Sequence, residues 1–408
     1  MANIEVHERK NCRICGSKNV IKWVHLPQMP LTDQLLLPDN FASEFLFDID
    51  VYVCSDCHAS QILHDIDYGQ YYLDYNYSVA GSAKATDFMK KLAKAVVDTF
   101  QLQEGAICVE IGSGDGAQLA CFKELGVKVY GYEPSAALCD VSEAIGVPVY
   151  QGLFTEQSIE YIPQEYRPAD VLLLTYTFDH IPEPMSFLKA AKQIINPQTG
   201  LLIMEVHDLD KIMERHEYCL FEHEHSVYLS LETMKKVLYK AGFLIVTHEI
   251  LPEEDRRGNS LLVVAAPFES VHAAKAMPID DNDGYDLNRH AIFADELTHA
   301  IDRLDDLVEG YWKQGKKIAG YGAGGRGVMT LAAMQSASRL EYVCDQNKNF
   351  QGKFMPKTHL PIVAPEELGI NPVDVLLVFS FGYIDEIRTA VLALPNAPRE
   401  IISLLEVI

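Results

Sequence analysis

The hydrophobic positions of the chain alternate between helical spacing and short continuous runs. Phe88, Leu92 and Val96 recur every four residues, which predicts a helix over residues 86–100. Runs of β-prone residues and further helices then follow one another along the chain. This alternation predicts a doubly wound, mostly parallel α/β sheet that ends in an antiparallel hairpin at one edge. The expected strands are 106–111, 128–133, 147–150, 170–176, 201–206, 243–250 and 260–266, and the expected helices are 118–125, 136–144, 184–195 and one from residue 230.

A second, smaller alternation begins after residues 267–287, whose polar composition is typical of a linker. A long helix with Leu304, Val308 and Tyr311 in register comes first. The pattern that follows predicts a separate small α/β domain. Its expected strands are 317–321, 342–344, 374–379 and 400–405.

Length and charge restrict the class of protein. At 408 residues, 48% of them hydrophobic, the chain is long enough for two or three packed domains. The formal net charge of −24 argues against nucleic acid or an anionic membrane surface as a partner. No long apolar run and no apolar leader is present, so we expect a soluble cytoplasmic protein. Nine scattered cysteines do not fit a secreted disulfide framework.

Three glycines follow the strand expected at 106–111, at alternate positions: Gly112, Gly114 and Gly116. Glycine lets the backbone approach a ligand closely, and the helix that follows presents its first N–H groups to it. We therefore expect a nucleotide-binding strand-turn-helix. The glycines alone do not specify the nucleotide, because Gly112, Gly114 and Ala117 also satisfy the dinucleotide pattern G-x-G-x-x-G/A.

Two acidic residues favour S-adenosylmethionine over a dinucleotide at this turn. Glu110 lies two residues before the first glycine, where its carboxylate would repel a pyrophosphate but attract an α-ammonium and a sulfonium. Glu133 ends the next strand, 23 residues after Glu110, which is the usual offset for an acid that accepts ribose hydroxyls. The alternative is that both are solvated surface residues beside an ordinary turn.

Residues just past the other strands are further candidates, because ligands of such sheets bind beyond the carboxyl ends of the strands. We expect Phe154 and Asp179 to contact the cofactor, and His180 follows Asp179 directly. The segment after residue 206 carries the most titratable side chains, namely His207, His216, Glu222, His223, Glu224 and His225.

Several chemistries compete for that histidine-rich segment. A zinc-protease helix needs H-E-x-x-H, but Val227 stands where the second histidine is required. A His/Glu metal site remains an alternative, and a purely structural role is the alternative for any single histidine. We favour general acid–base chemistry, because imidazole titrates near neutral pH and a neighbouring carboxylate orients it and raises its basicity.

Two C-x-x-C turns predict a metal centre in the N-terminal part of the chain. They contain Cys12 with Cys15 and Cys54 with Cys57, and 38 residues separate the two pairs. Two such turns that meet supply the four thiolates that zinc prefers in closed, structural sites. The wide gap requires an inserted sub-domain. A redox C-x-x-C and four unrelated thiols are the alternatives.

An aromatic segment follows, with five tyrosines among residues 68–77. Its interspersed Asp, Asn and Gly fit neither a helix face nor a clean strand, so we expect a loop. Packing of the zinc module onto the next domain is one explanation. The other is that one or two phenols hydrogen-bond a polar ligand.

A second glycine-rich turn lies in the C-terminal part of the chain. Gly322, Gly324 and Gly327 complete G-x-G-x-x-G, and Asp345 lies 18 residues past the last glycine. No acid precedes these glycines in the strand, and Arg326 with two nearby lysines supplies positive charge. This turn is the better candidate for a diphosphate, the alternative being that it only packs a helix on a strand.

In this order, the features resemble those of the S-adenosylmethionine-dependent C-methyltransferases that act on nucleotide-linked 4-keto-deoxysugars. The resemblance covers nearly the whole chain. It implies a zinc-binding domain over 1–80, a class I methyltransferase domain over 81–268 and a Rossmann-like domain over 269–408. The most specific marks are Cys-x-x-Cys-Gly at 12–16, Glu-Ile-Gly-x-x-x-Gly at 110–116, His-Glu-His at 223–225 before Ser226 and Tyr228, Gly-Tyr-Gly-Ala at 320–323, Asp345, and Pro-x-Thr-His-x-Pro at 356–361.

The resemblance implies that His225 is the catalytic base with Glu224 beside it, and that His180 and a tyrosine of the aromatic segment line the sugar site. A carbon nucleophile forms readily only beside a carbonyl, so we expect His225 to remove the C3 proton of a 4-keto sugar. Glu224 would orient the imidazole, and Tyr75, Tyr77 or His180 would donate to the developing enolate oxygen.

The sugar nucleotide is expected to contact the histidine-rich segment and the second glycine-rich turn. The family usually has tyrosine where this chain has Glu222, so that phenol and its hydrogen bond are missing and the sugar configuration stays open. The expected cofactors are S-adenosylmethionine and zinc, and the expected assembly is a monomer or small homo-oligomer. The expected substrate-binding residues are Glu222, His223, Gly322, Gly324, Arg326 and Asp345.

Two other classes of function fit parts of the chain. A nicotinamide-dependent nucleotide-sugar oxidoreductase or epimerase would use the second glycine-rich turn, with Asp345 as the ribose acceptor. A non-catalytic scaffold with a zinc module would leave the histidine-rich segment without a function. A buried His-Glu-His cluster remote from the Gly112 turn would favour the scaffold.

Overall fold

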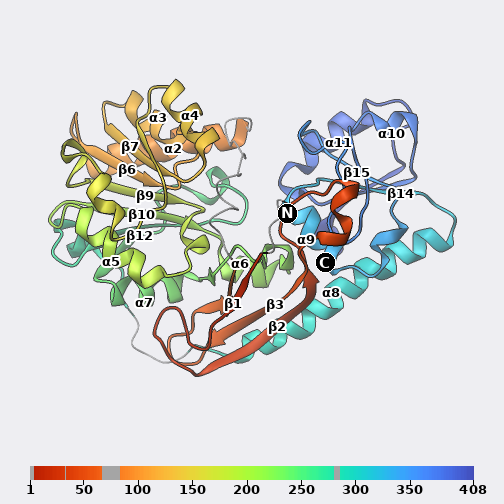
Figure 1. The fold of residues 1–408 in the computed structure, drawn as a ribbon, viewed down its shortest axis with the longest axis horizontal. Helices are drawn as coiled ribbons and strands as arrows, with labels where there is room; N and C mark the ends of the chain where they lie inside the picture. Colours follow the sequence, from red (N-terminus) through yellow and green to blue (C-terminus); the bar gives the residue numbers. More distant parts are fainter. Residues whose placement is uncertain (1–3, 33, 67–82, 280–284) are drawn as a thin grey trace.

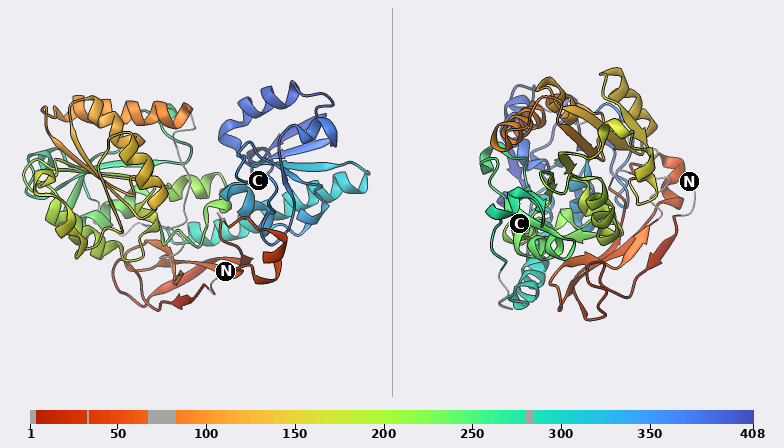
Figure 2. Two further views of the ribbon diagram at one scale, coloured as in Figure 1. Left: turned by 45° about the horizontal axis from the view of Figure 1, so that its top comes forward. Right: turned by 90° about the vertical axis from the view of Figure 1, so that its left-hand side faces the viewer.

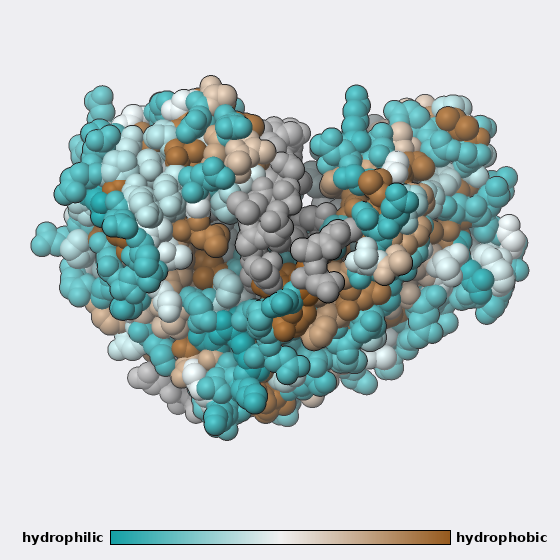
Figure 3. Space-filling view, in the orientation of Figure 1, coloured by the Kyte–Doolittle hydropathy of each residue, from teal (hydrophilic) through white to brown (hydrophobic). Residues whose placement is uncertain are grey.

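The computed structural model of the protein describes residues 4–32, 34–66, 83–279 and 285–408. Two α/β lobes stand side by side, and an N-terminal β-sheet lies beneath both of them (Figure 1, Figure 2). The space-filling view shows the lobes separated at the upper edge of the molecule, with hydrophilic residues over most of their outer faces (Figure 3). None of the helices within these ranges is long and apolar enough to cross a membrane.

The first lobe is built on a seven-stranded sheet of order β12-β13-β10-β9-β6-β7-β8. β13 is antiparallel to both of its neighbours, while β6 to β10 are parallel to one another. This confirms the expected class I methyltransferase sheet with its antiparallel edge. The strands are β6 (Ile107–Ile111), β7 (Lys128–Glu133), β8 (Val149–Gln151), β9 (Val171–Thr175), β10 (Leu201–Val206), β12 (Phe243–Thr247) and β13 (Leu261–Pro267).

Helices cover both faces of this sheet, which explains why β9, β10 and β13 read as continuous apolar runs. A separate hydrophobic core fills each face. The carboxyl ends of the parallel strands therefore meet at one edge, where polar side chains can gather. The helices are α2 (Ala83–Phe100), α3 (Ala117–Glu124), α4 (Ala136–Ala144), α5 (Pro184–Ile194), α6 (Leu209–Glu214) and α7 (Leu231–Lys240).

The N-terminal part forms a four-stranded antiparallel sheet of order β11-β4-β3-β2 and a two-stranded sheet of β1 with β5. β11 belongs to the first lobe in sequence but pairs with β4. A strand of two residues has no periodicity of its own, so the sequence pattern did not predict it. The strands are β1 (Val6–Glu8), β2 (Val20–Met29), β3 (Phe47–Cys54), β4 (Ser60–Ile62), β5 (His64–Ile66) and β11 (Val227–Tyr228).

The second lobe confirms the expected small α/β domain. The long helix α8 (Asn288–Lys313) leads into a parallel sheet of order β16-β15-β14-β17-β18. One hydrophobic core joins this lobe to the N-terminal sheet and to residues 218–221 of the histidine-rich segment. The other elements are β14 (Ile318–Tyr321), α9 (Gly325–Ala333), β15 (Val343–Cys344), β16 (Ile362–Val363), α10 (Glu367–Ile370), β17 (Val375–Val378), α11 (Ile384–Leu392) and β18 (Glu400–Ser403).

Candidate active site

The first glycine-rich turn lies beyond the carboxyl end of β6. Gly112 has a φ of +72°, and a Cβ at this position would come within 2.5 Å of Thr177 Oγ1, so only glycine fits without displacing Thr177. Gly114 has a φ of +54°, but a Cβ there would meet nothing within 4 Å. Gly116 packs against Ser142 of α4. The turn is therefore tightly packed at its two ends and open at Gly114, where a ligand can approach the backbone.

Two buried carboxylates flank this turn. Glu110 is 1% exposed, its Oε1 accepts a hydrogen bond from Thr175 at 3.2 Å, and its Oε2 has no partner within the described ranges. Burial raises the pKa of Glu110 well above its usual value. Glu133 accepts hydrogen bonds from the backbone N–H groups of Gly114 (2.9 Å) and Ser135 (2.8 Å). An unpaired buried acceptor beside an open glycine turn fits the α-ammonium of S-adenosylmethionine.

Phe154 lies beyond β8, at the edge where the cofactor is expected. Its ring is buried and contacts Tyr132 and Phe187 edge-on, with 5.3 Å between ring centroids in both pairs. These contacts place the ring in the core on one face of the sheet. A contact between Phe154 and the cofactor stays a prediction.

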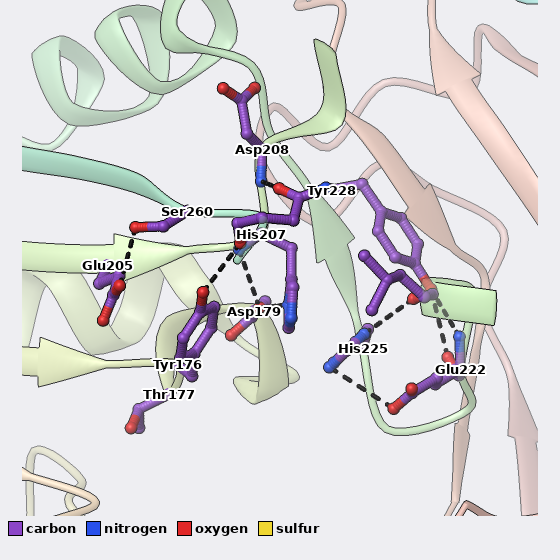
Figure 4. Close-up of polar contacts among 12 residues, drawn as sticks. Tyr176, Thr177, Asp179, Glu205, His207, Asp208, Glu222, His225, Tyr228 and Ser260 are labelled. Atoms are coloured by element: carbon purple, nitrogen blue, oxygen red, sulfur yellow. Dashed lines mark hydrogen bonds and ion pairs between the residues drawn. The ribbon is translucent and has the colours of Figure 1, made fainter. Parts of the chain in front are cut away.

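Asp179 and three histidines form a compact imidazole cluster beyond β9 and β10. Figure 4 shows three of these four residues, Asp179, His207 and His225. Asp179 Oδ2 accepts a hydrogen bond from His207 Nδ1 at 2.9 Å. The ring centroid of His225 lies 4.6 Å from that of His180 and 4.9 Å from that of His207. Burial raises the pKa of Asp179, but the His207 hydrogen bond and the other imidazoles outweigh this effect and lower it. The carboxylate is therefore ionised and orients the cluster.

The imidazole cluster adjoins the first glycine-rich turn. Thr177 fills the space beside Gly112, and Asp179 follows on the short 3₁₀ turn Phe178–His180. His225, the last residue of the His-Glu-His run, is buried but belongs to a cluster that is not remote from the turn, which argues against the non-catalytic scaffold.

His225 presents one ring nitrogen to the site. Nδ1 lies 2.9 Å from the carbonyl oxygen of Leu220, so Nδ1–H donates there and the lone pair is on Nε2. Nε2 lies 3.7 Å from Glu222 Oε2. Burial lowers the pKa of His225 to about 3, so the ring is neutral near pH 7. A neutral imidazole with its lone pair on Nε2 is the form that a general base requires.

The carboxylate beside His225 in the structure is that of Glu222, whereas the sequence led us to expect Glu224 there. Glu224 Oε1 instead accepts hydrogen bonds from the backbone N–H and the hydroxyl of Thr32, both at 3.2 Å. Neighbouring residues of an irregular loop point in different directions, so proximity in sequence did not identify the partner.

His223 contacts the N-terminal part of the chain, and its expected contact with the substrate stays a prediction. Its ring is fully buried, with Nδ1 2.8 Å from His64 Nε2 and Nε2 3.0 Å from the carbonyl oxygen of Met29. Both ring nitrogens are therefore engaged with the N-terminal part of the chain. The side chain links the histidine-rich segment to that part.

Backbone contacts fix the loop that carries His225. The Tyr228 hydroxyl accepts a hydrogen bond from the Glu222 N–H (3.1 Å) and donates to the Glu222 carbonyl (3.2 Å). The Ser226 N–H donates to the Asp179 carbonyl at 2.7 Å. Since β11 pairs with β4 immediately afterwards, the loop is bound to two sheets at once.

Neighbouring groups of the second lobe pack closely around the second glycine-rich turn. Gly322 has a φ of +104°, and a Cβ there would come within 2.3 Å of Ser380 Oγ. Asp345 accepts hydrogen bonds from the backbone N–H groups of Ala323 (2.7 Å) and Asn347 (2.8 Å). Gly324 has open space around its Cα, as Gly114 does in the first turn.

This second turn lies against the histidine-rich segment. A Cβ at Gly325 would come within 3.2 Å of Glu222 Oε1. The Arg326 guanidinium lies 4.7 Å from the Phe381 ring centroid, and its buried Nε has no acceptor among the described residues. The fold thus brings the predicted diphosphate site next to the carboxylate that faces His225.

The four predicted metal ligands come together. The Sγ atoms of Cys12 and Cys57 are 3.5 Å apart, as are those of Cys15 and Cys54, and all four lie within 4.8 Å of one another. Tetrahedral zinc with Zn–S bonds of about 2.3 Å separates its sulfurs by about 3.8 Å. The donor set therefore fits zinc. Hydrogen bonds from Cys57 and Gln61 lower the pKa of Cys12, while the same Cys12–Cys57 contact and burial raise the pKa of Cys57.

Two predicted tyrosines and one histidine without an assigned role remain. Tyr75 and Tyr77 lie outside the described residues. His207 received no role of its own from the sequence, yet it is the hydrogen-bond partner of Asp179. Its position directly after β10 was the available signal, because residues beyond neighbouring parallel strands converge. With Asp179 engaged in this pair, its contact with the cofactor stays a prediction.

Three protein-family models match consecutive parts of the chain. A zinc binding domain matches residues 12–72, a methyltransferase domain residues 84–248, and a C-methyltransferase C-terminal domain residues 264–401. The chain is also 29% identical over 384 residues to the C-methyltransferase NovU of Streptomyces niveus, across 92% of this chain and 90% of that protein. These matches favour methyl transfer over the nicotinamide-dependent alternative.

Solved structures resemble only part of the chain. A S-adenosylmethionine-dependent methyltransferase of Thermotoga maritima is 24% identical, covers 44% of this chain and 89% of its own, and has a TM-score of 0.31. The PH0226 protein of Pyrococcus horikoshii OT3 is 16% identical, covers 48% of this chain and 98% of its own, and has a TM-score of 0.38. Scores this low carry no conclusion about this chain.

The zinc site predicts the effect of removing one ligand. Cys54→Ser leaves three thiolates, so we expect loss of the metal and a Tm lowered by about 5 °C or more. Elemental analysis and thermal denaturation measure the two effects. Cys121→Ser, outside the cluster, is the matched control and should retain zinc. Full zinc content in the Cys54 variant would contradict the assignment.

Proposed function

We propose that the chain, which its matches identify as an S-adenosylmethionine-dependent C-methyltransferase, methylates C3 of a nucleotide-linked 4-keto-6-deoxysugar. One observation supports this proposal above the others. Nε2 of the neutral His225 ring faces Glu222, and Glu222 in turn lies against the second glycine-rich turn. The predicted base is therefore next to the predicted diphosphate site, as a sugar joined to a diphosphate requires.

His225 removes the C3 proton of the sugar in this proposal. The ketone at C4 makes that proton acidic, and the electron pair left at C3 delocalises onto the C4 oxygen. Nε2 accepts the proton, while the Nδ1–H bond to Leu220 holds the ring in place. The conjugate acid gains stability from the ionised Asp179, whose charge raises the pKa of His225 against the effect of burial. Glu222 Oε2 lies 3.7 Å from Nε2.

Hydrogen-bond donors stabilise the developing negative charge on the C4 oxygen. His180, whose ring contacts that of His225, is one donor that the proposal assigns. Tyr75 and Tyr77 remain the other two. Donors that are already in place at the start of the reaction need no reorganisation, which is why such groups contribute strongly to catalysis.

The cofactor binds at the first glycine-rich turn in this proposal. S-adenosylmethionine, when bound, supplies an electrophilic methyl group to the carbon nucleophile. Glu110 binds its α-ammonium, Glu133 its ribose hydroxyls, and Gly114 allows close backbone approach. Phe154 borders the same crevice. The contact between Gly112 and Thr177 supports this placement, because it puts the crevice beside the imidazole cluster.

The nucleotide diphosphate binds at the second glycine-rich turn, with Gly322, Gly324, Arg326 and Asp345 as its contact region. The N-terminus of α9 directs N–H groups toward this region, and Arg326 contributes a positive charge. Binding the diphosphate here would leave the sugar to extend toward Glu222. Holding both reactants in fixed positions is worth several orders of magnitude in rate.

The proposal also covers the domain boundaries, the cellular location and the oligomeric state. The proposed domains are residues 1–80, 81–268 and 269–408, with β11 exchanged from the second to the first. The starts of the three family matches, at residues 12, 84 and 264, support these boundaries. Zinc thiolates and unpaired cysteines persist in a reducing compartment, which supports a cytoplasmic location. A monomer or small homo-oligomer is proposed.

Replacing the base tests the reaction. His225→Asn should lower the rate of methyl transfer by about 10²–10⁴-fold, because no other lone pair replaces Nε2. Transfer from methyl-labelled cofactor to a panel of 4-keto nucleotide sugars measures it. The variant should also lose deuterium exchange at C3 in D₂O, while its cofactor affinity stays close to that of the wild type. His299→Asn, an exposed histidine of α8, is the control. Unchanged turnover in the His225 variant would remove it from the mechanism.

Cofactor binding should release a proton from Glu110. Its raised pKa means that the free protein retains the proton to higher pH than usual, whereas a bound α-ammonium favours the ionised carboxylate. Calorimetry in two buffers of different ionisation enthalpy, at pH values near neutral, measures this release. Glu110→Gln should abolish it and weaken binding by about tenfold or more. Glu124→Gln, exposed on α3, serves as the control, and equal affinity in the Glu110 variant would place the cofactor elsewhere.

Arg326 should affect substrate binding more than chemistry. Arg326→Ala removes a charge–phosphate contact, so we expect KM for the nucleotide sugar to rise about tenfold with kcat changed little. Steady-state kinetics on the best substrate of the panel gives both constants. Lys313→Ala, at the end of α8, is the matched loss of one positive charge. A KM equal to that of the wild type would separate the second turn from the diphosphate.

A further inference from the structure

A buried arginine near the cofactor turn has no part in the function described so far. Arg257 lies in the charged loop between β12 and β13, and its side chain is 16% exposed. Its guanidinium lies against two aromatic rings, with Cζ 4.6 Å from the centroids of both Phe88 and Tyr176. Stacking uses the two faces of the guanidinium and leaves the N–H groups at its edge for hydrogen bonds.

Only some of the N–H groups at the edge of the Arg257 guanidinium have a hydrogen-bond partner. Nη2 forms an ion pair with Glu205, which is fully buried and also accepts a hydrogen bond from Ser260 Oγ at 2.7 Å. Nε, in contrast, is shielded from solvent and has no acceptor among the residues that the structure describes. A shielded N–H group without an acceptor is costly and rare, so it calls for a ligand that completes it.

The stack around Arg257 is held in a fixed place. Tyr176 has a φ of +51°, which is uncommon for a residue other than glycine, and its hydroxyl donates to the Asn259 carbonyl at 2.8 Å. The loop that carries Arg257 is thereby tied to the residue that follows β9. A backbone conformation of this kind persists where the surrounding contacts demand it.

The unpaired Nε has a counterpart of opposite charge nearby. Thr175 donates to Glu110, and the guanidinium of Arg257 lies over the ring of the next residue, Tyr176, so Glu110 and Arg257 lie near the same end of β9. Their charges attract each other, yet Glu110 Oε2 and Arg257 Nε both lack a hydrogen-bond partner within the described chain. This part of the structure thus offers one carboxyl oxygen and one guanidinium N–H group, both without a hydrogen-bond partner, to a single ligand.

We propose that Arg257 binds the α-carboxylate of S-adenosylmethionine while Glu110 binds its α-ammonium. This inference rests on the cofactor crevice proposed above. The ligand carries both charges on the same α-carbon, which matches an acceptor and a donor that share one crevice. A carboxylate needs a cation here, because the carboxylates of Asp115 and Glu133 also act on this region. The planar N–H edge of arginine suits a carboxylate better than a lysine ammonium does.

Calorimetry with three ligands tests the proposal on the whole zinc-loaded protein. The ligands are S-adenosylmethionine, its decarboxylated form, which keeps the ammonium, and 5′-methylthioadenosine, which has neither charge. Arg257→Gln should bind S-adenosylmethionine about 10–100-fold more weakly and the other two within about twofold of the wild type. The wild type should prefer S-adenosylmethionine over its decarboxylated form by a similar factor. Arg257→Lys should recover only part of the loss.

The controls separate recognition from folding. Arg256→Gln changes the adjacent arginine, whose guanidinium donates to the carbonyls of Leu251 and His248. Because Arg257→Gln leaves Glu205 buried without its cation, the double variant Glu205→Gln/Arg257→Gln is measured beside it. The double variant should show the same ligand selectivity as Arg257→Gln.

The outcomes distinguish this inference from the proposed function. Equal weakening of all three ligands would give Arg257 a folding role only, and unchanged binding of S-adenosylmethionine would place the carboxylate on another group. Either result overturns the inference while the wild type still binds the cofactor. A wild type that binds neither S-adenosylmethionine nor methylthioadenosine would overturn the proposed crevice itself.

Discussion

The position of the His225 imidazole depends on one short strand pairing. β11 leaves the first lobe to pair with β4, while Ser226, immediately before it, donates to the carbonyl of Asp179 beyond β9. The loop between Glu222 and Tyr228 is therefore attached to two sheets at once. A loop with so little freedom can keep a buried imidazole neutral and aimed in one direction, which an exposed loop of the same sequence could not do. The cost of burying that ring is met by contacts formed elsewhere in the fold.

The pKa values of two buried carboxyl groups at this edge of the sheet are shifted in opposite directions. Glu110 is buried with one oxygen unpaired, and burial raises its pKa. Asp179 is equally buried, but the His207 hydrogen bond and two more imidazoles lower its pKa. One acid is thus set to ionise when a cation arrives, and the other is an anion throughout. Environments that separate the protonation states of neighbouring carboxyl groups are typical of sites that bind and transform charged ligands.

The N-terminal sheet packs against both lobes and connects them. Its zinc-binding end shares a core with the first lobe, through Cys12, Ile14 and Cys54. Its opposite side shares a core with α8, α9 and residues 218–221. The histidine-rich segment lies between these two cores, so both glycine-rich turns face it from different lobes. The zinc site therefore takes no direct part in the reaction, but it contributes to the geometry on which the reaction depends.

Local pattern in the sequence determined the sheet of the first lobe, the glycine-rich turns and the zinc ligands. Strand periodicity, the conformational freedom of glycine and the spacing of C-x-x-C are properties of neighbouring residues, so they can be read from short stretches of chain. The partners within the site were decided only by the tertiary structure. Glu222 rather than Glu224 faces His225, Asp179 pairs with His207, and β11 joins a distant sheet. The direction of a side chain on an irregular loop is set by long-range contacts, and no repeating pattern in the sequence records those contacts.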